Sequence, residues 1–213
     1  MAAVPSIPCN TCPGAETAPR WQRLDWPDGE FLYLPAFWPA AEADRLLQQL
    51  RDLPDWTRHQ VRLFGRLLPA PRLSAWYGDP GTSYRYSGVR HQPLPWPPLL
   101  LRLREEVSAA SGRIFNAVLA NRYDCGRDAM GWHSDDEPEL GPQPVIASAS
   151  FGAARRFLLR HRRSGRREAI TLAHGSLLLM AGDSQRCWQH AVPRTTRPLG
   201  LRINLTFRHV QPR

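Results

Sequence analysis

The chain contains no lysine, so all 28 of the basic side chains in its 213 residues are arginines. Schiff-base chemistry and a Walker-type phosphate loop both need a lysine, and the sequence therefore excludes both. A GC-rich coding bias would replace Lys with Arg whatever the function. That bias does not explain the net charge of +9. Because guanidinium groups pair well with phosphate, this charge favours a polyanionic partner.

Cysteine is scarce and no apolar run is long enough to span a bilayer. Cys9 and Cys12 form a C-x-x-C pair, which could begin a zinc or redox site. No second pair follows, so an incidental pair is favoured.

The first ten residues lack the basic start and apolar core of a secretory signal. We therefore expect a monomer without a membrane partner, cytoplasmic in a bacterium or nuclear in a eukaryote.

The chain divides into a flexible tail over residues 1–20 and a single domain over 21–213. A helix is predicted from Ala40 to Leu53, because its leucines recur on one face. Residues 56–91 combine arginines and aromatics with Gly and Pro, which predicts hairpins and loops. A second helix is expected after Pro98, ending at Gly112.

Short strands separated by turns fill the second half of the chain. We predict them near 117–123, 145–151, 156–161, 168–171, 176–180, 188–192 and 201–208. In the last one, Ile203, Leu205 and Phe207 alternate with polar residues that include Arg202 and Arg208, so one face belongs to a core. The pattern predicts a mostly β fold, a double-stranded β-helix (jelly roll) with the N-terminal helices packed on one sheet.

His133 and Asp135 lie two residues apart, and on a strand such residues point to the same side. Two imidazoles and one carboxylate on one face of a metal form the triad of non-haem Fe(II) oxygenases. His190 is the best candidate for the third ligand, with His161, His174 and His209 as alternatives. Arg202 and Arg208 follow His190, and an arginine fork can hold the far carboxylate of a dicarboxylate cosubstrate. A solvated strand face is the alternative for these arginines.

An ordered series of motifs then resembles the AlkB family of dioxygenases that act on alkylated nucleic acids. The series runs through Asn121-Arg-Tyr123, Gly131-Trp-His133-Ser-Asp135-Asp136-Glu137, Ile146–Phe157, His174-Gly-Ser-Leu-Leu, His190-Ala-Val-Pro and Arg202-Ile-Asn-Leu-Thr-Phe-Arg208. The segment from Tyr77 to Gly88 is similar to the substrate-side element of the branch with the double-strand-preferring animal repair enzyme.

The resemblance implies a role for each matching residue. The implied catalytic metal ligands are His133, Asp135 and His190. The implied 2-oxoglutarate pocket is Asn121, Tyr123, Arg202, Thr206 and Arg208, and the implied substrate residues are Tyr84, Tyr86, Asp136, Glu137, Arg156 and Phe64.

Tyr86 would stack on a flipped base opposite the His133 ring, and Phe64 would enter the base stack as a wedge. Ordinary packing is the alternative for both aromatic residues, and a solvated acidic turn is the alternative for Asp136 and Glu137. The arginines between Arg155 and Arg167 would bind phosphate, and a solvated loop is the alternative for them.

The activity implied by the resemblance is oxidative demethylation of DNA bases, with 1-methyladenine and 3-methylcytosine as substrates and formaldehyde and succinate as products. Its cofactor would be Fe(II), with 2-oxoglutarate and O2 as cosubstrates. Two alternatives stay open: an oxygenase acting on RNA or a protein side chain, and a catalytically silent nucleic-acid-binding module with a structural metal. A structural metal site needs four protein ligands, and the sequence offers only three candidates.

Overall fold

The computed structural model describes residues 20–63, 66–82, 84–86 and 89–211. The predicted tail with Cys9 and Cys12 falls outside the described residues, and so does Phe64. The helices are α1 (Ala40–Arg51), α2 (Pro98–Ser111) and α3 (Ser184–Cys187), with a 3-10 turn, η1 (Pro138–Leu140). The strands are β1 (Gln22–Arg23), β2 (Glu30–Leu34), β3 (Gln60–Leu63), β4 (Arg66–Pro69), β5 (Leu73–Gly78), β6 (Tyr84–Tyr86), β7 (Val89–His91), β8 (Ala117–Tyr123), β9 (Met130–His133), β10 (Ile146–Gly152), β11 (Arg155–His161), β12 (Arg167–Leu172), β13 (Ser176–Ala181), β14 (Trp188–Val192) and β15 (Arg202–Arg208).

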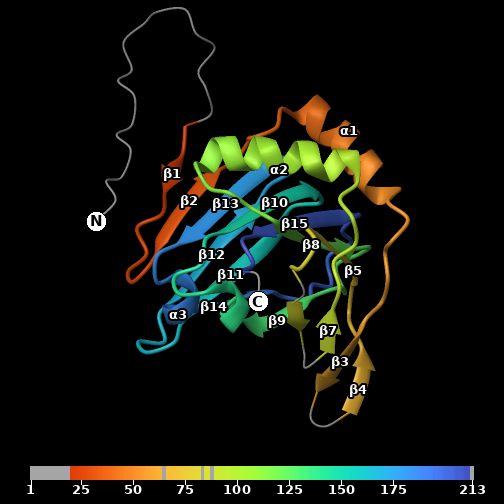
Figure 1. Cartoon of the computed structure of the whole chain (residues 1–213). Coiled ribbons are helices and arrows are strands. Elements are labelled where there is room, and N and C mark those ends of the chain that lie inside the picture. The colour runs from red at the N-terminus through yellow and green to blue at the C-terminus, as the bar shows by residue number, and fades with distance from the viewer. Residues whose placement is uncertain (1–19, 64–65, 83, 87–88, 212–213) are drawn as a thin grey trace, which may run out of the picture.

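Two antiparallel sheets form the body of the fold (Figure 1). The larger sheet has seven strands in the order β1-β2-β13-β10-β15-β8-β5, and the smaller has four in the order β12-β11-β14-β9. The hairpins β3–β4 and β6–β7 form two separate two-stranded sheets. This arrangement confirms the predicted mostly β, two-sheet jelly roll.

Helices α1 and α2 cover the outer face of the seven-stranded sheet (Figure 1). Pro39 and Pro97 precede the two helices, and Gly112 ends α2 with a left-handed φ of 63°. A non-glycine residue would be strained in that conformation. The buried side chains of this layer are Leu46 and Leu50 of α1, Leu100, Leu103 and Val107 of α2, and Ile203, Leu205 and Phe207 of β15. Burying one such side chain stabilises the fold by about 1.5–3 kcal/mol.

A second core fills the space between the two sheets. Phe157 and Leu159 of β11 and Trp188 of β14 meet Leu119 of β8 and Leu178 of β13 there. The smaller sheet presents Phe157, Leu159 and Trp188 inward. The space between the two sheets is therefore polar only where polar side chains enter it.

Most predicted elements agree with the structure to within two residues, and β8 and β14 agree at both ends. Five elements differ. Strands β1 and β9, the turn η1 and the short helix α3 were not expected as elements, and β5 joins the seven-stranded sheet instead of a local hairpin. Among the described residues, none of the helices is both long enough and apolar enough to span a membrane.

Candidate metal centre

Three potential metal ligands converge between the two sheets. Strands β9 and β14 pair so that His133 lies opposite His190 in the register. The Nε2 atoms of these histidines are 3.1 Å apart, and His190 Nε2 lies 3.8 Å from Asp135 Oδ2. Two ligands about 2.1 Å from one ion and at right angles are about 3 Å apart, so the spacing suits an ion between them.

Within the part of the chain that the structure describes, this is the one group of three such residues with ligand atoms close enough to share an ion. Of the other candidate histidines, His209 is exposed and the remaining two have different partners. His161 contacts Asp28 and Ser164, and His174 contacts Asp44 and the amide of Gly152. The structure therefore selects His190 from the alternatives for the third ligand.

The protonation of the cluster suits a cation. Burial lowers the pKa of His190 to about 3, with the neighbouring His133 as the next cause. Burial also lowers the pKa of His133. Burial alone would raise the pKa of Asp135, but Arg208 and the two imidazoles outweigh it and hold this pKa below its usual value. Two neutral imidazoles and one carboxylate leave their lone pairs free for a metal.

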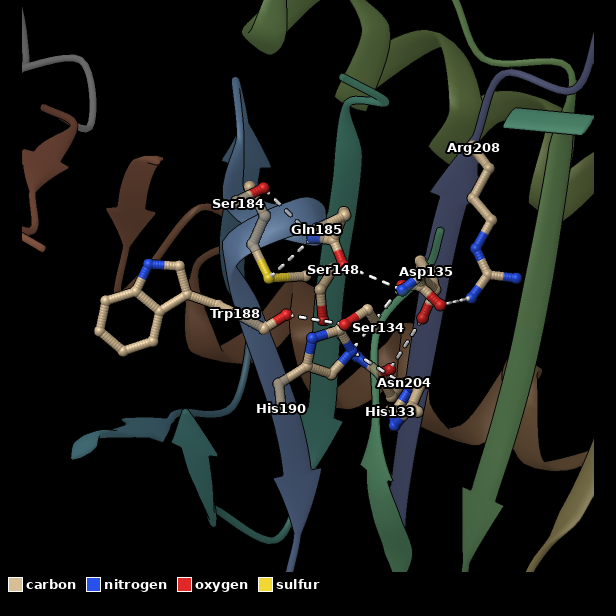
Figure 2. A network of polar contacts seen from close by, with 12 residues as sticks. His133, Ser134, Asp135, Ser148, Ser184, Gln185, Trp188, His190, Asn204 and Arg208 are labelled. Atoms are coloured by element: carbon tan, nitrogen blue, oxygen red, sulfur yellow. Dashed lines mark hydrogen bonds and ion pairs between the residues drawn. The ribbon is translucent and has the colours of Figure 1, made fainter. Parts of the chain in front are cut away.

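The loop that carries Asp135 is held from both sides, as Figure 2 shows. Strand β9 ends at His133, so the carboxylate does not reach the site by strand alternation as predicted. Ser134 Oγ donates to the carbonyl of Trp188 at 2.7 Å, and the amide of Asp135 donates to Oε1 of Gln185 at 3.0 Å. Both partners precede His190 in the chain. The two halves of the triad are therefore fastened to each other by hydrogen bonds.

The polar face of β15 forms a pocket beside the triad. Arg202, Asn204, Thr206 and Arg208 are all buried, which excludes the solvated strand face. Strand β8 pairs with β15 and adds Asn121 and Tyr123 to the lining. The pocket is lined by Leu119, Asn121, Tyr123, Met130, His133, Asp135, Ser148, Phe157, Met180, His190, Val192, Arg202, Asn204, Thr206 and Arg208. Metal ligands and arginines thus share one cavity between the sheets.

Arg202 has the features of an anion-binding residue. Its Nη2 donates to Ser150 Oγ at 3.0 Å, and its guanidinium lies 5.0 Å from the centre of the Tyr123 ring. Its Nε and Nη1 are buried and have no hydrogen-bond partner among the described residues. A buried cation with two unsatisfied donors is costly unless an anion pairs with it. One carboxylate of a dicarboxylate, bound with its other end toward the triad, would satisfy both donors.

Several supporting residues were not predicted. Gln185 lies in the unexpected helix α3. Arg72 donates to Oδ1 of Asn121 at 2.6 Å, and Asn204 donates to Ser148 Oγ at 2.9 Å. Arg155 is buried and donates to three backbone carbonyls, so it does not belong to an exposed phosphate grip. No sequence motif reveals such contacts, because each joins residues that are far apart in the chain.

The structure describes only part of the predicted substrate side. The backbone of Tyr84 and Tyr86 forms β6, but their side chains are outside the described residues, as is Phe64. Asp136 is exposed and pairs with Arg162 at 2.8 Å, and Glu137 is half-buried. Arg156 is exposed on the face of β11 opposite to that of Phe157, so the structure does not bring it to the pocket.

The family model described as the 2OG-Fe(II) oxygenase superfamily matches residues 30–208. The human protein named DNA oxidative demethylase ALKBH2 is 40% identical over 208 residues, covering 92% of this chain and 79% of the relative. The chain belongs to the AlkB family of 2OG-Fe(II) oxygenases. Enzymes of this superfamily use Fe(II), 2-oxoglutarate and O2, and the triad and the Arg202 pocket fit the first two.

Other AlkB proteins agree with this assignment. The mouse protein of the same name is 43% identical, covering 81% of this chain and 77% of its own. The bovine protein named alpha-ketoglutarate-dependent dioxygenase alkB homolog 3 is 42% identical, covering 84% and 65%. A solved structure titled "The structure of OsALKBH1" matches with a TM-score of 0.56 at 17% identity, covering 84% of this chain and 97% of that one. At that identity it supports the fold alone.

Proposed function

We propose that this AlkB-family chain is an oxidative demethylase that removes methyl groups from 1-methyladenine and 3-methylcytosine in DNA. The observation that carries the proposal is the shared pocket of the three ligand residues and the unsatisfied donors of Arg202. The similarity to proteins named DNA oxidative demethylase supports DNA as the substrate. The net charge of +9 favours the same partner.

His133, Asp135 and His190 would hold Fe(II), which with 2-oxoglutarate and O2 supplies the oxidation that releases the methyl group as formaldehyde. Arg202 would pair with the distal carboxylate of 2-oxoglutarate, with Asn121, Tyr123 and Thr206 beside it. Arg208 would keep Asp135 ionised and aimed at the metal, because its Nη2 lies 2.6 Å from Oδ1 of that residue. The protein thus supplies the ligands, the orientation and a cavity between the sheets.

The methyl groups lie on the base-pairing edge, so the base must leave the helix to reach the pocket. We propose that Tyr86 stacks on this base opposite His133, that Tyr84, Asp136 and Glu137 contact its polar edge, and that Phe64 fills the gap that it leaves. Acidic groups favour these substrates because methylation at a ring nitrogen gives the base a positive charge. The monomeric state, the cytoplasmic location and RNA as a substrate stay predictions.

The test is formaldehyde release from oligonucleotides that carry one methylated base, with Fe(II), 2-oxoglutarate and ascorbate present. The substrates are single-stranded DNA, duplex DNA, RNA and an unmethylated control. A His190→Ala protein serves as the matched inactive control. We expect turnover on methylated DNA and none with the control oligonucleotide or the variant. Absence of formaldehyde from every DNA substrate, in protein that binds metal and 2-oxoglutarate, would overturn the proposal.

A further inference from the structure

Trp132 is one of two large hydrophobic side chains that are exposed among the described residues, and 39% of its surface is accessible. It directly precedes His133 on β9, and neighbouring strand residues point to opposite faces. His133 points inward to the metal centre, so Trp132 lies on the outer face of the four-stranded sheet. Strand β9 is an edge strand of that sheet. The indole is thus separated from the metal centre by the thickness of one strand.

The guanidinium of Arg160 orients this indole. Its central carbon lies 4.8 Å from the centre of the Trp132 ring, in the range of a cation–π contact. Nη2 of Arg160 donates to Oε1 of Gln189 at 2.7 Å, which fixes the guanidinium in turn. Arg160 is also paired in register with Arg167 on β12. Arg160 therefore contacts Trp132 and Gln189 on one side and pairs with Arg167 on the other, so the four side chains form one group on the outer face.

The charge of this surface has one sign. Besides this group, Arg156 extends from β11 and is exposed like Arg167. The only acidic residue in the four strands, Glu168, is opposite the inward-facing Leu159 and pairs with Arg166 instead. Among the described residues, no carboxylate forms an ion pair with Arg156, Arg160 or Arg167. We call Trp132, Gln189, Arg156, Arg160 and Arg167 the outer arginine face.

We propose that the outer arginine face binds the single-stranded nucleic acid next to the target base, with one base stacked on Trp132 and the phosphates on the three arginines. Aromatic rings combined with cations are the general means of binding single strands without sequence preference. The inference rests on the proposed DNA substrate and deepens it.

The placement of Trp132 favours a single strand over a duplex. A chain with its target base beside His133 must pass around the edge of β9 to reach Trp132, which needs a sharp bend. A single strand bends freely, whereas a duplex pays for bending and for unstacking the base that Trp132 would accept. The contact of the target base beside His133 and the contact of a second base with Trp132 would together hold the single-stranded nucleic acid on both sides of β9.

The test measures fluorescence anisotropy of short unmethylated oligonucleotides at fixed salt, with the full chain and three variants. Trp132→Ala removes the ring, Trp132→Phe keeps an aromatic ring, and Ile114→Ala changes the other exposed large side chain as a matched control. The ligands are a single-stranded oligonucleotide, its duplex, an abasic strand of the same length and polyglutamate. Thermal melting of each variant checks that it is folded.

We expect Trp132→Ala to weaken single-strand binding about tenfold, within the range of losses measured for base–aromatic stacking. Trp132→Phe should recover part of the loss, and Ile114→Ala should match the unchanged chain. The abasic strand should bind the unchanged chain and Trp132→Ala equally, because it offers no base to stack.

Unchanged single-strand affinity in folded Trp132→Ala would overturn the inference. An equal loss on the abasic strand or on polyglutamate would also overturn it, because the face would then be a general site for anions or acidic proteins. Failure of the proposed chemistry is a separate result, since it appears as missing formaldehyde while the Trp132-dependent binding persists.

Discussion

Nη2 of Arg208 lies 2.6 Å from Oδ1 of Asp135, and both side chains are almost completely buried. The pair joins the last residue of β15 to the loop that follows β9, on the opposite sheet. It leaves the second carboxylate oxygen, Oδ2, directed toward His190 at 3.8 Å. The arginine thus neutralises the carboxylate on one side and leaves the other side for a metal.

The first prediction concerns this pair. Arg208→Lys keeps the charge but loses the planar fork, so Asp135 should be held less rigidly. We expect metal affinity to fall about 10-fold or more, as is typical when a partner that orients a metal ligand is changed. Titration with Mn(II), followed by tryptophan fluorescence, measures the loss. Arg45→Lys, at an exposed ion pair on α1, is the control. Unchanged Mn(II) affinity would show that Arg208 does not orient Asp135.

The second prediction separates the two arginines of β15. Arg202 does not contact Asp135, so Arg202→Met should leave metal binding largely intact and weaken 2-oxoglutarate binding. Charge-assisted hydrogen bonds contribute about 1.5–3 kcal/mol each, so we expect the KM for 2-oxoglutarate to rise roughly 10- to 100-fold. Steady-state rates at varied 2-oxoglutarate measure this change. An unchanged KM would mean that the cosubstrate carboxylate lies elsewhere.

The third prediction concerns Gln185, whose side-chain carbonyl accepts the amide of Asp135 at 3.0 Å. Gln185→Met has a similar shape but offers no such acceptor, so the buried amide would lose its partner. We expect the free energy of unfolding to fall by about 1–3 kcal/mol, together with weaker metal binding. Gln185→Glu, which keeps an acceptor oxygen at that position, should recover part of the stability. Urea denaturation of both variants tests this, and equal stabilities of all three proteins would contradict it.

The fourth prediction concerns metal removal. His133 and Asp135 come from β9 and the loop after it, whereas His190 comes from β14. A ligand that binds only the folded state stabilises that state by mass action. The Tm should therefore drop after treatment with a chelator and recover when Mn(II) is added back. A His190→Ala protein should show a much smaller response to both steps. A chelator-induced change of equal size in this variant would mean that the metal stabilises another part of the chain.

Several parts of the site were predictable because local chemistry determines them. The alternation in residues 201–208 predicted both faces of β15. It left open whether Arg202 and Arg208 are buried or solvated, and the structure shows them buried. His190 was favoured by the position of Arg202 after it. The stop of α2 at Gly112 followed from the glycine itself, which tolerates a left-handed φ.

The rest depends on contacts that a sequence pattern does not encode. Strand β9 is only Met130–His133, and it contains a glycine and an exposed indole, so it lacks the alternation of a half-buried strand. Helix α3 has four residues, too few for a helical period. Gln185 matters because folding brings it to Asp135, fifty residues earlier in the chain. Tertiary placement gives these residues their roles.

Strand β15 has consequences for how the chain tolerates change. Its apolar side faces the helices, and its polar side lines the pocket. A shift of one residue in its pairing with β8 and β10 would reverse both sides at once. Arginines would then be forced against α1 and α2, while apolar side chains would displace the cosubstrate. We therefore expect a deletion within residues 202–208 to cause misfolding, so that its effect on catalysis is not observed. This segment can vary only by substitution.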